Sequence, residues 1–202
     1  MKTEKARIKK YSKLILASAS PRRKYILKKA GFKFHIVIPQ IKEIFIKNNP
    51  YVTVSENAKR KGIWCASHYP SSWIIAADTT VAFKGECISK PKNIKEAKEF
   101  LSKFSGKKQI VYTGLFIAPP SKKPVIRVVK SSVYFKELSA EIIHDYLKKV
   151  NPLDKAGAYD INQHGNKIIS RYTGSYSNIM GLPIETIVSI LKKKGFQQCY
   201  NL

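Results

Sequence analysis

Carboxylates are scarce in this chain: 13 aspartates and glutamates stand against 38 lysines and arginines among its 202 residues. The resulting formal charge of +25 favours polyanionic partners such as nucleotides, nucleic acid or an anionic membrane, and it says little about the fold. We favour the simpler interpretation of a surface that is basic throughout, without a dedicated nucleic-acid groove.

Cysteine is also rare, and its positions argue against two classes of protein. Cys65, Cys87 and Cys199 form no CxxC pair, and no histidine lies at a spacing typical of a zinc site. Thiols without such a pattern predict a reducing cytoplasm rather than a disulfide-rich secreted fold. Long apolar runs are absent too, and the basic start MKTEKARIKKYSK precedes no signal-peptide core. We therefore predict a soluble cytoplasmic protein that does not bind a membrane.

Repeats and low-complexity linkers are absent, and the chain is long enough to bury a core. With 44% hydrophobic residues, it is predicted to form a single domain over 1–202, in which 1–12 are a basic tail. Strand-like and helix-like segments follow one another in mixed order. This order predicts an α/β (mixed α+β) fold, with one twisted mixed sheet flanked by helices.

Hydrophobic patterning places the elements of that fold. Short apolar runs between turn residues predict strands at 14–17, 34–38, 73–83, 110–118 and 125–135. Apolar residues at helical spacing predict helices at 21–30, 54–67, 94–104, 140–150 and 183–195. Ser55 is the predicted cap of the second helix. Between the last two helices, 151–181 is predicted to be rich in loops.

The first predicted helix begins in the stretch SASPRR, which places two arginines where a helix disfavours them. Ser20 is a good N-cap, and Pro21 suits the first helical position. Arg22 and Arg23 therefore fall in the first turn, where free N–H groups and the macrodipole are already positive. One interpretation is a bound phosphate, held by the arginines and by the hydroxyls of Ser18 and Ser20. The other is a pair of solvated arginines on a basic protein.

Two of the scarce acids stand in apolar surroundings. Asp78 interrupts the strand-like run WIIAADTTVAF, and Glu43 lies among large aliphatic residues in IKEIFI. A carboxylate in such a place is costly unless it is paired, metal-bound or protonated. Asp78 could instead bond its own backbone at a strand end, and Glu43 could occupy one exposed position of an alternating strand. With Lys61 and Lys90 as candidate cations, the two acids together indicate phosphoryl chemistry with a divalent cation.

Taken together, these motifs resemble those of Maf-like nucleoside triphosphate pyrophosphatases. LILASASPRR, AKRK, AADTTV, SKP, YTG, DKAGAY and GSYSNIMGLPIE occur in the order found in that family, from about 14 to 191. The resemblance implies a Maf/ITPase-like fold and hydrolysis of a nucleoside triphosphate to the monophosphate and pyrophosphate. It also implies a divalent metal, Mg²⁺ or Mn²⁺. The activity is viewed as house-cleaning, and family members were first linked to septum formation.

The resemblance also implies roles for individual residues. Carried over by position, Asp78 accepts the proton of the attacking water, and Glu43 and Asp78 lie near the metal. The residues implied to hold the phosphates or to line their cradle are Arg23, Lys61, Lys90, Ser18 and Ser20. A substrate polyanion of this kind would explain the two arginines at the start of a helix, because its charge offsets the unfavourable dipole.

Base preference within the family is implied by three positions. Arg22 and Thr79 match the subgroup that prefers dTTP and UTP. At the third position the family has Gln after AGAYxI, whereas this chain has Asn162 followed by Gln163. An Asn keeps the donor and the acceptor of the amide but is one methylene shorter. Either Asn162 still contacts a pyrimidine edge, or Gln163 takes over that contact.

A second hypothesis is a non-catalytic nucleotide-binding or nucleic-acid-binding protein that uses the charge of +25. The chain contains no nucleic-acid-binding motif, so we expect no specific nucleic-acid partner. A regulator of cell division without turnover is a third hypothesis. A homodimer is expected only from the family resemblance.

Overall fold

The computed structural model describes residues 13–197, so the predicted basic tail at 1–12 and Cys199 lie outside the described residues. Seven strands form one mixed sheet in the order β2-β1-β3-β5-β6-β7, and β4 pairs with β3. The strands are β1 (Leu14–Ala17), β2 (His35–Val37), β3 (Trp73–Phe83), β4 (Glu86–Ile88), β5 (Lys108–Ala118), β6 (Val125–Phe135) and β7 (Ile169–Thr173). β1 is parallel to β2 and β3, and the remaining pairs are antiparallel. The predicted mixed α/β architecture is confirmed.

Helices flank this sheet. They are α1 (Pro21–Lys29), α2 (Pro50–His68), α3 (Ile94–Phe104), α4 (Ala140–Leu147), α5 (Gly165–Ile168), α6 (Tyr176–Ile179) and α7 (Ile184–Lys193), with one 3₁₀ turn, η1 (Ala156–Ala158). Within 13–197, no helix combines the length and the apolar character that a membrane crossing requires.

Several predicted bounds are confirmed and others are wrong. The strands at 14–17, 73–83 and 125–135 and the helix at 94–104 have the predicted limits. The second helix begins at Pro50 rather than Val54. Asn49 caps it by accepting a hydrogen bond from the Val52 N–H at 3.1 Å, so Ser55 lies inside the helix. The segment at 151–181 holds η1, α5, β7 and α6, which were not predicted, and neither was β4.

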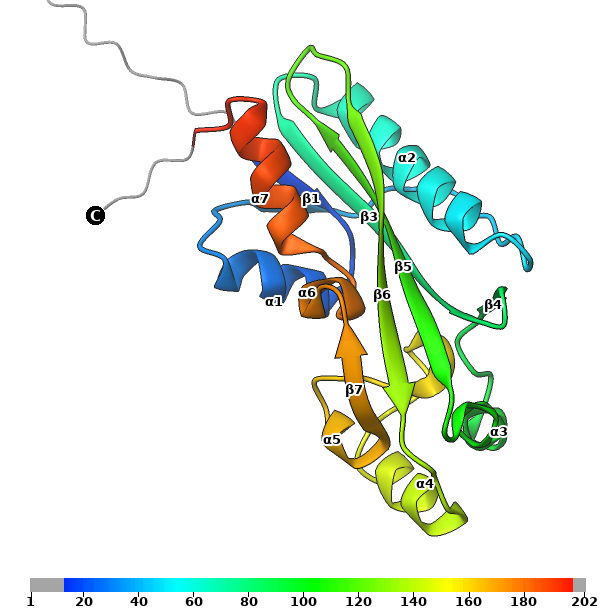
Figure 1. Cartoon of the computed structure of the whole chain (residues 1–202). Helices are drawn as coiled ribbons and strands as arrows, with labels where there is room; N and C mark the ends of the chain where they lie inside the picture. The colour runs from blue at the N-terminus through cyan, green and yellow to red at the C-terminus, as the bar shows by residue number, and fades with distance from the viewer. Residues whose placement is uncertain (1–12, 198–202) are drawn as a thin grey trace, which may run out of the picture.

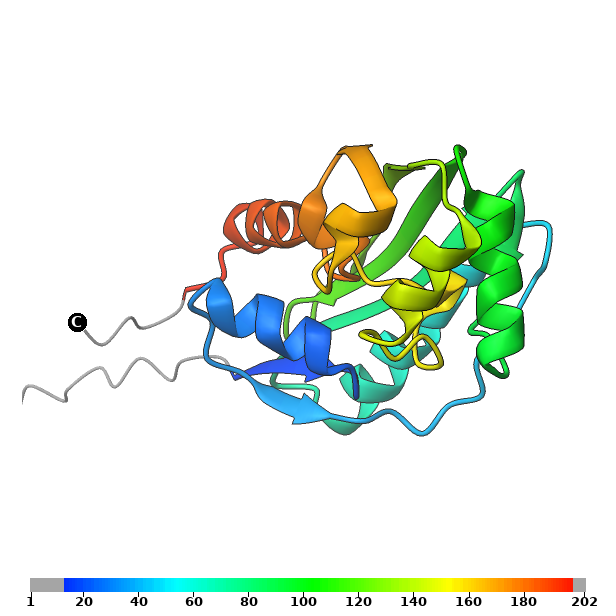
Figure 2. The ribbon, with the colours of Figure 1, turned by 90° about the horizontal axis from the view of Figure 1, so that it is seen from below.

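The helices divide between the two faces of the sheet and its lower end (Figure 1). α1 and α7 pack on one face of β1, β3 and β5, around residues such as Leu27, Leu115 and Ile187. α2 packs on the opposite face, where Ala58 and Phe116 belong to a second cluster. A third cluster fills the lower end beneath α3 and α4, which lie side by side in Figure 2. The long strands β3, β5 and β6 therefore extend from the part of the sheet covered by α1, α2 and α7 to the lower end, which is called the lower half below.

Glycines let α2 approach the sheet closely. A Cβ at Gly62 would lie 2.0 Å from the Phe116 ring, and a Cβ at Gly114 would lie 2.1 Å from the carbonyl oxygen of Val54. Gly114 pairs with Asp78 across β3 and β5. The missing side chain thus brings α2 close to the sheet beside the one carboxylate that interrupts β3.

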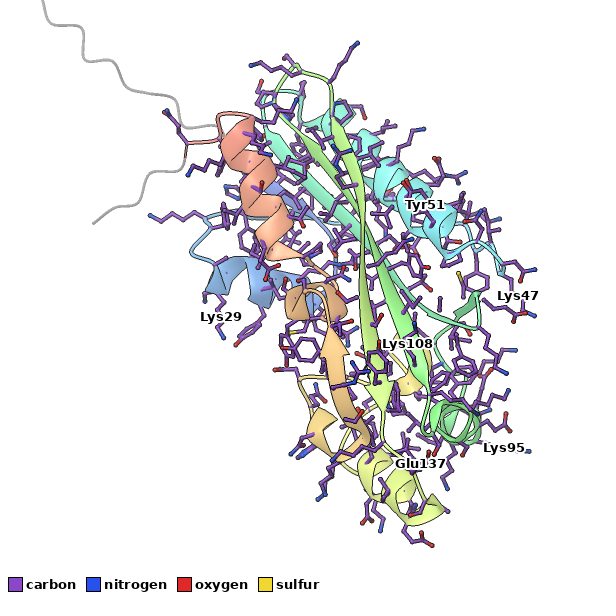
Figure 3. All side chains as sticks on the ribbon, viewed as in Figure 1. Lys29, Lys47, Tyr51, Lys95, Lys108 and Glu137 are labelled. Atoms are coloured by element: carbon purple, nitrogen blue, oxygen red, sulfur yellow. The ribbon has the colours of Figure 1, made fainter. Side chains whose placement is uncertain are left out.

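Replacing Gly114 by alanine should destabilise the fold, because the contact it would create is with helix backbone, which cannot rotate away. We expect Gly114→Ala to lower the free energy of unfolding by roughly 1–3 kcal/mol, as overpacking does. Denaturant unfolding measures this difference. Lys108→Ala on the same strand is the control, since Lys108 is exposed (Figure 3) and surface changes stay within about 0.5 kcal/mol. Equal stability of the two variants would contradict the close-packing argument.

Candidate active site

A cavity of about 600 Å³ opens between the sheet, the start of α1 and the loops of the lower half. It is large enough for a small-molecule ligand. The predicted site residues that line it are Ser18, Ser20, Arg22, Arg23, Glu43, Lys61, Asp78, Thr79, Lys90 and Gln163. Asn162 is the one predicted residue outside the lining. Predicted site residues as far apart as Ser18 and Gln163, 145 positions in the chain, thus share one cavity.

The beginning of α1 faces this cavity, and no acidic residue occupies its first turn. Ser20 is the N-cap, as predicted, with its hydroxyl accepting from the Arg23 N–H at 3.5 Å. The Ser18 hydroxyl, at the end of β1, accepts from the Ser20 N–H at 3.2 Å. Both serines therefore belong to the turn that joins β1 to α1. That turn presents the positive end of a nine-residue helix to the cavity.

Arg23 is anchored by neutral acceptors. Its Nε donates to the Gly181 carbonyl oxygen at 2.8 Å, and its Nη2 donates to Thr79 Oγ1 at 3.0 Å. Its Nη1 donates to Ser18 Oγ at 3.2 Å and to the Ala77 carbonyl oxygen at 3.0 Å. Burial lowers the pKa of Arg23, although Asp78 opposes the shift. Because a guanidinium has five N–H donors, these four bonds leave one N–H for a ligand.

Lys61 joins the two acids that the sequence singles out. Its Nζ lies 2.6 Å from Glu43 Oε1 and 2.7 Å from Asp78 Oδ1. Lys61 and Asp78 are each 9% exposed, so α2 and β3 enclose their ion pair. The Glu43 side chain is 55% exposed on the segment that leads into α2. Pairing is therefore what satisfies Asp78 inside an apolar strand, in place of the local backbone turn that we weighed as the alternative.

Asn57 completes this cluster, and the sequence analysis missed it. It lies one helical turn before Lys61 on α2, and its Nδ2 donates to Asp78 Oδ2 at 3.0 Å. Its amide also bonds Ile44 twice: Oδ1 accepts from the Ile44 N–H at 2.8 Å, and Nδ2 donates to the Ile44 carbonyl oxygen at 2.9 Å. Asn57 thereby fixes the backbone beside Glu43 relative to Asp78. The available signal was an amide on the buried stripe of α2, four residues from Lys61.

The cations of the cavity act on the ionisation of Glu43. Partial burial alone would raise the pKa of this carboxyl group. The hydrogen bond and charge of Lys61, together with the charges of Arg23 and Lys90, outweigh burial, so the pKa of Glu43 lies below its ordinary value. Glu43 is therefore ionised at neutral pH. Lys90 is exposed at the rim of the cavity.

The lower side of the cavity carries the loop that follows η1. Asp160 lies in this loop and pairs with Arg22, whose Nη1 lies 3.3 Å from Asp160 Oδ2. Asn162 lies outside the lining of the cavity. Its Oδ1 accepts a hydrogen bond from the Tyr176 hydroxyl at 3.4 Å. Gln163 lines the cavity instead. Sequence reasoning missed Asp160, although an acid between Tyr159 and Ile161 in so basic a chain was a signal.

Glu43 and Asp78 are the donors that a divalent cation would use in this cavity. Among residues 13–197, no group of three or more His, Cys, Asp or Glu side chains could form a complete metal cage. Mg²⁺ does not need one, because it binds through one or two carboxylates together with substrate phosphates and water. Two carboxylate groups joined by one lysine therefore fit a metal of this kind that is shared with a ligand.

Fold and cavity together define a class: an α/β protein whose mixed sheet carries a cation-lined cavity with two carboxylates joined by one lysine. A family model described as "Maf-like protein" matches residues 13–194. The chain belongs to this family. The resemblance drawn from the ordered motifs is thereby confirmed.

Relatives support the same assignment. A protein of Geobacillus sp. (strain WCH70), named dTTP/UTP pyrophosphatase, is 39% identical over 184 residues, which cover 91% of this chain and 98% of that protein. A Fusobacterium nucleatum protein of the same name is 40% identical over 185 residues, with 91% and 96% covered. The solved structure of the Staphylococcus aureus Ham1 protein covers 91% of this chain and 100% of its own, at 16% identity and a TM-score of 0.53. That structure shows likeness of fold alone.

Removing the Lys61 cation should change the titration of Glu43. In the folded protein the pKa of Glu43 is below its ordinary value of 4.5, so its contribution to stability is present above that pH and is lost as the pH falls through the folded pKa. We expect Lys61→Met to raise the pKa of Glu43, because the hydrogen bond and the nearest positive charge disappear. NMR titration of the carboxyl carbons measures it.

Glu185 provides an internal control in the same spectra. Burial would raise the pKa of Glu185, but hydrogen bonds from its own backbone N–H and from the Ser177 and Ser175 hydroxyls, at 2.8 and 2.9 Å, lower it without involving Lys61. Its titration should be the same in both proteins. A Glu43 pKa that is unchanged in Lys61→Met would show that the ion pair does not control this carboxyl group.

Proposed function

We propose that this chain hydrolyses nucleoside triphosphates, with dTTP and UTP preferred, to the monophosphate and pyrophosphate. The observation that carries the proposal is the cluster of Glu43, Lys61 and Asp78 beside the positive start of α1, in one cavity. The names of the relatives supply the reaction and the substrates. As a house-cleaning enzyme, the protein would remove triphosphates from the nucleotide pool.

The phosphates would bind at the start of α1. The remaining Arg23 N–H and the hydroxyls of Ser18 and Ser20 lie at that end, and the Lys90 ammonium group lines the same cavity. The neutral anchors of Arg23 keep its positive charge uncompensated by a direct carboxylate partner. A triphosphate would supply the negative charge that the first turn of α1 lacks. Lys61 would contribute its third N–H to the same group.

Asp78 would accept the proton of the attacking water. The water oxygen forms a bond to the α-phosphorus, the bond from that phosphorus to the bridging oxygen breaks, and pyrophosphate leaves with the electron pair. The proton passes to an Asp78 carboxylate oxygen. The hydrogen bonds from Lys61 and Asn57 hold this carboxylate in one orientation, so little rearrangement precedes the step.

We also propose a divalent cation, Mg²⁺ or Mn²⁺, held by Glu43 and Asp78. When bound, it would neutralise phosphate charge and favour ionisation of water. The protein's own part is to present two ionised oxygens from different segments at one place. The Glu43 pKa below its ordinary value ensures that this carboxylate is charged at neutral pH.

Base preference would depend on Arg22, Thr79 and Gln163. Gln163 is the better candidate for contact with the pyrimidine edge, because it lines the cavity while Asn162 bonds Tyr176. Thr79 would act through Arg23, because the Arg23 Nη2 donates a hydrogen bond to the Thr79 hydroxyl. A homodimer is proposed on the family resemblance, and a cytoplasmic location is proposed on the cysteines, which form no CxxC pair.

The proposal can be tested with a panel of triphosphates. Purified protein with Mg²⁺ or Mn²⁺ should release pyrophosphate from dTTP and UTP faster than from purine triphosphates. Asp78→Asn should lower kcat by about 10²–10⁴-fold, the usual contribution of a general base. The asparagine oxygen can still accept from Lys61, but its NH2 group then faces the Asn57 Nδ2 donor, so circular dichroism is used to check that the variant is folded.

Asp145→Asn is the matched control, because Asp145 is exposed on α4 and outside the cavity. It should keep the wild-type rate. Turnover of dTTP and UTP no faster than that of Asp78→Asn would overturn the proposal. Triphosphate binding that survives in Asp78→Asn without any turnover in the wild type would instead favour a non-catalytic nucleotide-binding protein.

A further inference from the structure

Asp160 is a buried carboxylate in the lining of the cavity, and the proposed reaction assigns it no role. Its side chain is 4% exposed. It belongs to the loop after η1, whereas its ion-pair partner Arg22 belongs to α1. Among the ion pairs of the described residues, this pair joins the two sides of the cavity across 138 positions of the chain.

The backbone of Asp160 is fixed from behind. Its N–H donates to the Tyr146 hydroxyl at 2.9 Å, and that hydroxyl donates to the Asp160 carbonyl oxygen at 3.3 Å. Tyr146 is fully buried, and burial raises the pKa of its phenol, so it remains a neutral hydroxyl with both a donor and an acceptor. The buried Tyr146 therefore fixes the position of the backbone that carries the Asp160 carboxylate.

The two carboxylate oxygens have different partners. Oδ1 accepts from the Asn162 N–H at 2.9 Å, which closes the turn that leads to Gln163. Oδ2 pairs with Arg22 at 3.3 Å. The Asp160 side chain thus shapes the loop that carries Gln163, and it also holds Arg22 of α1.

Pairing also sorts the cations of the cavity into two groups. Arg22 pairs with Asp160, Lys61 pairs with Glu43 and Asp78, and Lys155 pairs with Asp154 at 2.6 Å. In the part of the cavity that the structure describes, Arg23 and Lys90 have no carboxylate within ion-pair distance. Arg23 and Lys90, whose charges both act on Glu43, are therefore the unpaired cations that the proposed phosphates can use.

We propose that Asp160 is a positioning residue that neutralises Arg22 and holds it for the base, so that the phosphates bind at the Arg23 and Lys90 end of the cavity. This inference rests on the proposed function. Without the carboxylate charge, Arg22 becomes a second attractive site for phosphate. A triphosphate then binds in two orientations, of which one is unproductive.

Asp160→Asn isolates the charge, because an asparagine oxygen can still accept from the Asn162 N–H and keep the turn. An added unproductive complex lowers kcat and KM together, so we expect both constants for dTTP and UTP to fall about threefold to tenfold. Pyrophosphate should bind tighter by a similar factor, as befits an ion pair whose arginine is 34% exposed. Steady-state kinetics measures the first change, and calorimetric titration with pyrophosphate measures the second. A merely structural defect would raise KM and weaken pyrophosphate binding, so a lower KM together with tighter pyrophosphate binding identifies the charge effect.

Two further variants complete the design. In an Arg22→Ala background, Asp160→Asn should change neither KM nor pyrophosphate affinity, because the charge that it frees is already absent. Glu86→Gln is the matched control: it removes the exposed Lys47–Glu86 pair at 3.2 Å, outside the cavity, and should leave both quantities unchanged (Figure 3 labels Lys47).

The two measurements separate this inference from the proposed function. Pyrophosphate that binds Asp160→Asn no tighter than the wild type would overturn the role of Asp160, whatever the turnover. A wild type without turnover, together with tighter pyrophosphate binding by Asp160→Asn, would refute the hydrolytic function while supporting the control of charge by Asp160.

Discussion

The ion pairs of Lys61 with Glu43 and Asp78 connect three segments at the cavity: α2, β3 and the segment before α2. A lysine and an aspartate that are each 9% exposed would be costly as isolated charges, so each requires the other. Their 2.7 Å separation in turn requires α2 to lie very close to the sheet. Gly114, directly opposite Asp78, permits that approach. Close packing and charge pairing are thus one constraint at this place.

Arg23 solves a different electrostatic problem. Positive charge at the start of a helix is unfavourable, and burial adds to the cost, as the lowered pKa of Arg23 shows. The structure offsets the cost with carbonyl and hydroxyl acceptors rather than with a carboxylate. Neutral acceptors fix the guanidinium without cancelling its charge. Arg23 therefore still attracts an anion. Arg22 attracts an anion less strongly, because the Asp160 carboxylate offsets its charge.

The sequence predicted those parts of the fold that depend on local patterning. Apolar runs located β1, β3 and β6, and helical spacing located α3, with their limits, because their apolar residues are contiguous or regularly spaced along the chain. β7 escaped prediction because four of its five residues are exposed, which leaves no apolar signal. The start of α2 was misplaced because Ser55 is as good a cap in isolation as Asn49. The local signal that favours Asn49 is Pro50, which suits the first helical position as Pro21 does in α1.

The same division holds for the site. Asp78, Glu43 and the arginines of α1 were found because their type conflicts with their surroundings, and such conflicts are visible in a sequence. Asn57 was missed because an asparagine in a helix is unremarkable until the helix is oriented. The sequence left the alternatives at Asn162 and Gln163 open, since a turn that depends on Asp160 decides which amide lines the cavity.

Charge distribution gives the scarcity of acids a physical meaning. Of the 13 carboxylates in the chain, Glu43, Asp78, Asp154 and Asp160 line this single cavity. Each of the four has a lysine or an arginine as its partner there. A groove for nonspecific binding of nucleic acid would gain from leaving its cations unpaired, because affinity rises with every neutralised phosphate. In this cavity Arg22, Lys61 and Lys155 are paired with carboxylates, which reduces the attraction for polyanions in general. Positive charge remains at Arg23 and Lys90, which suits a small ligand that carries its negative charge on one group, such as a triphosphate.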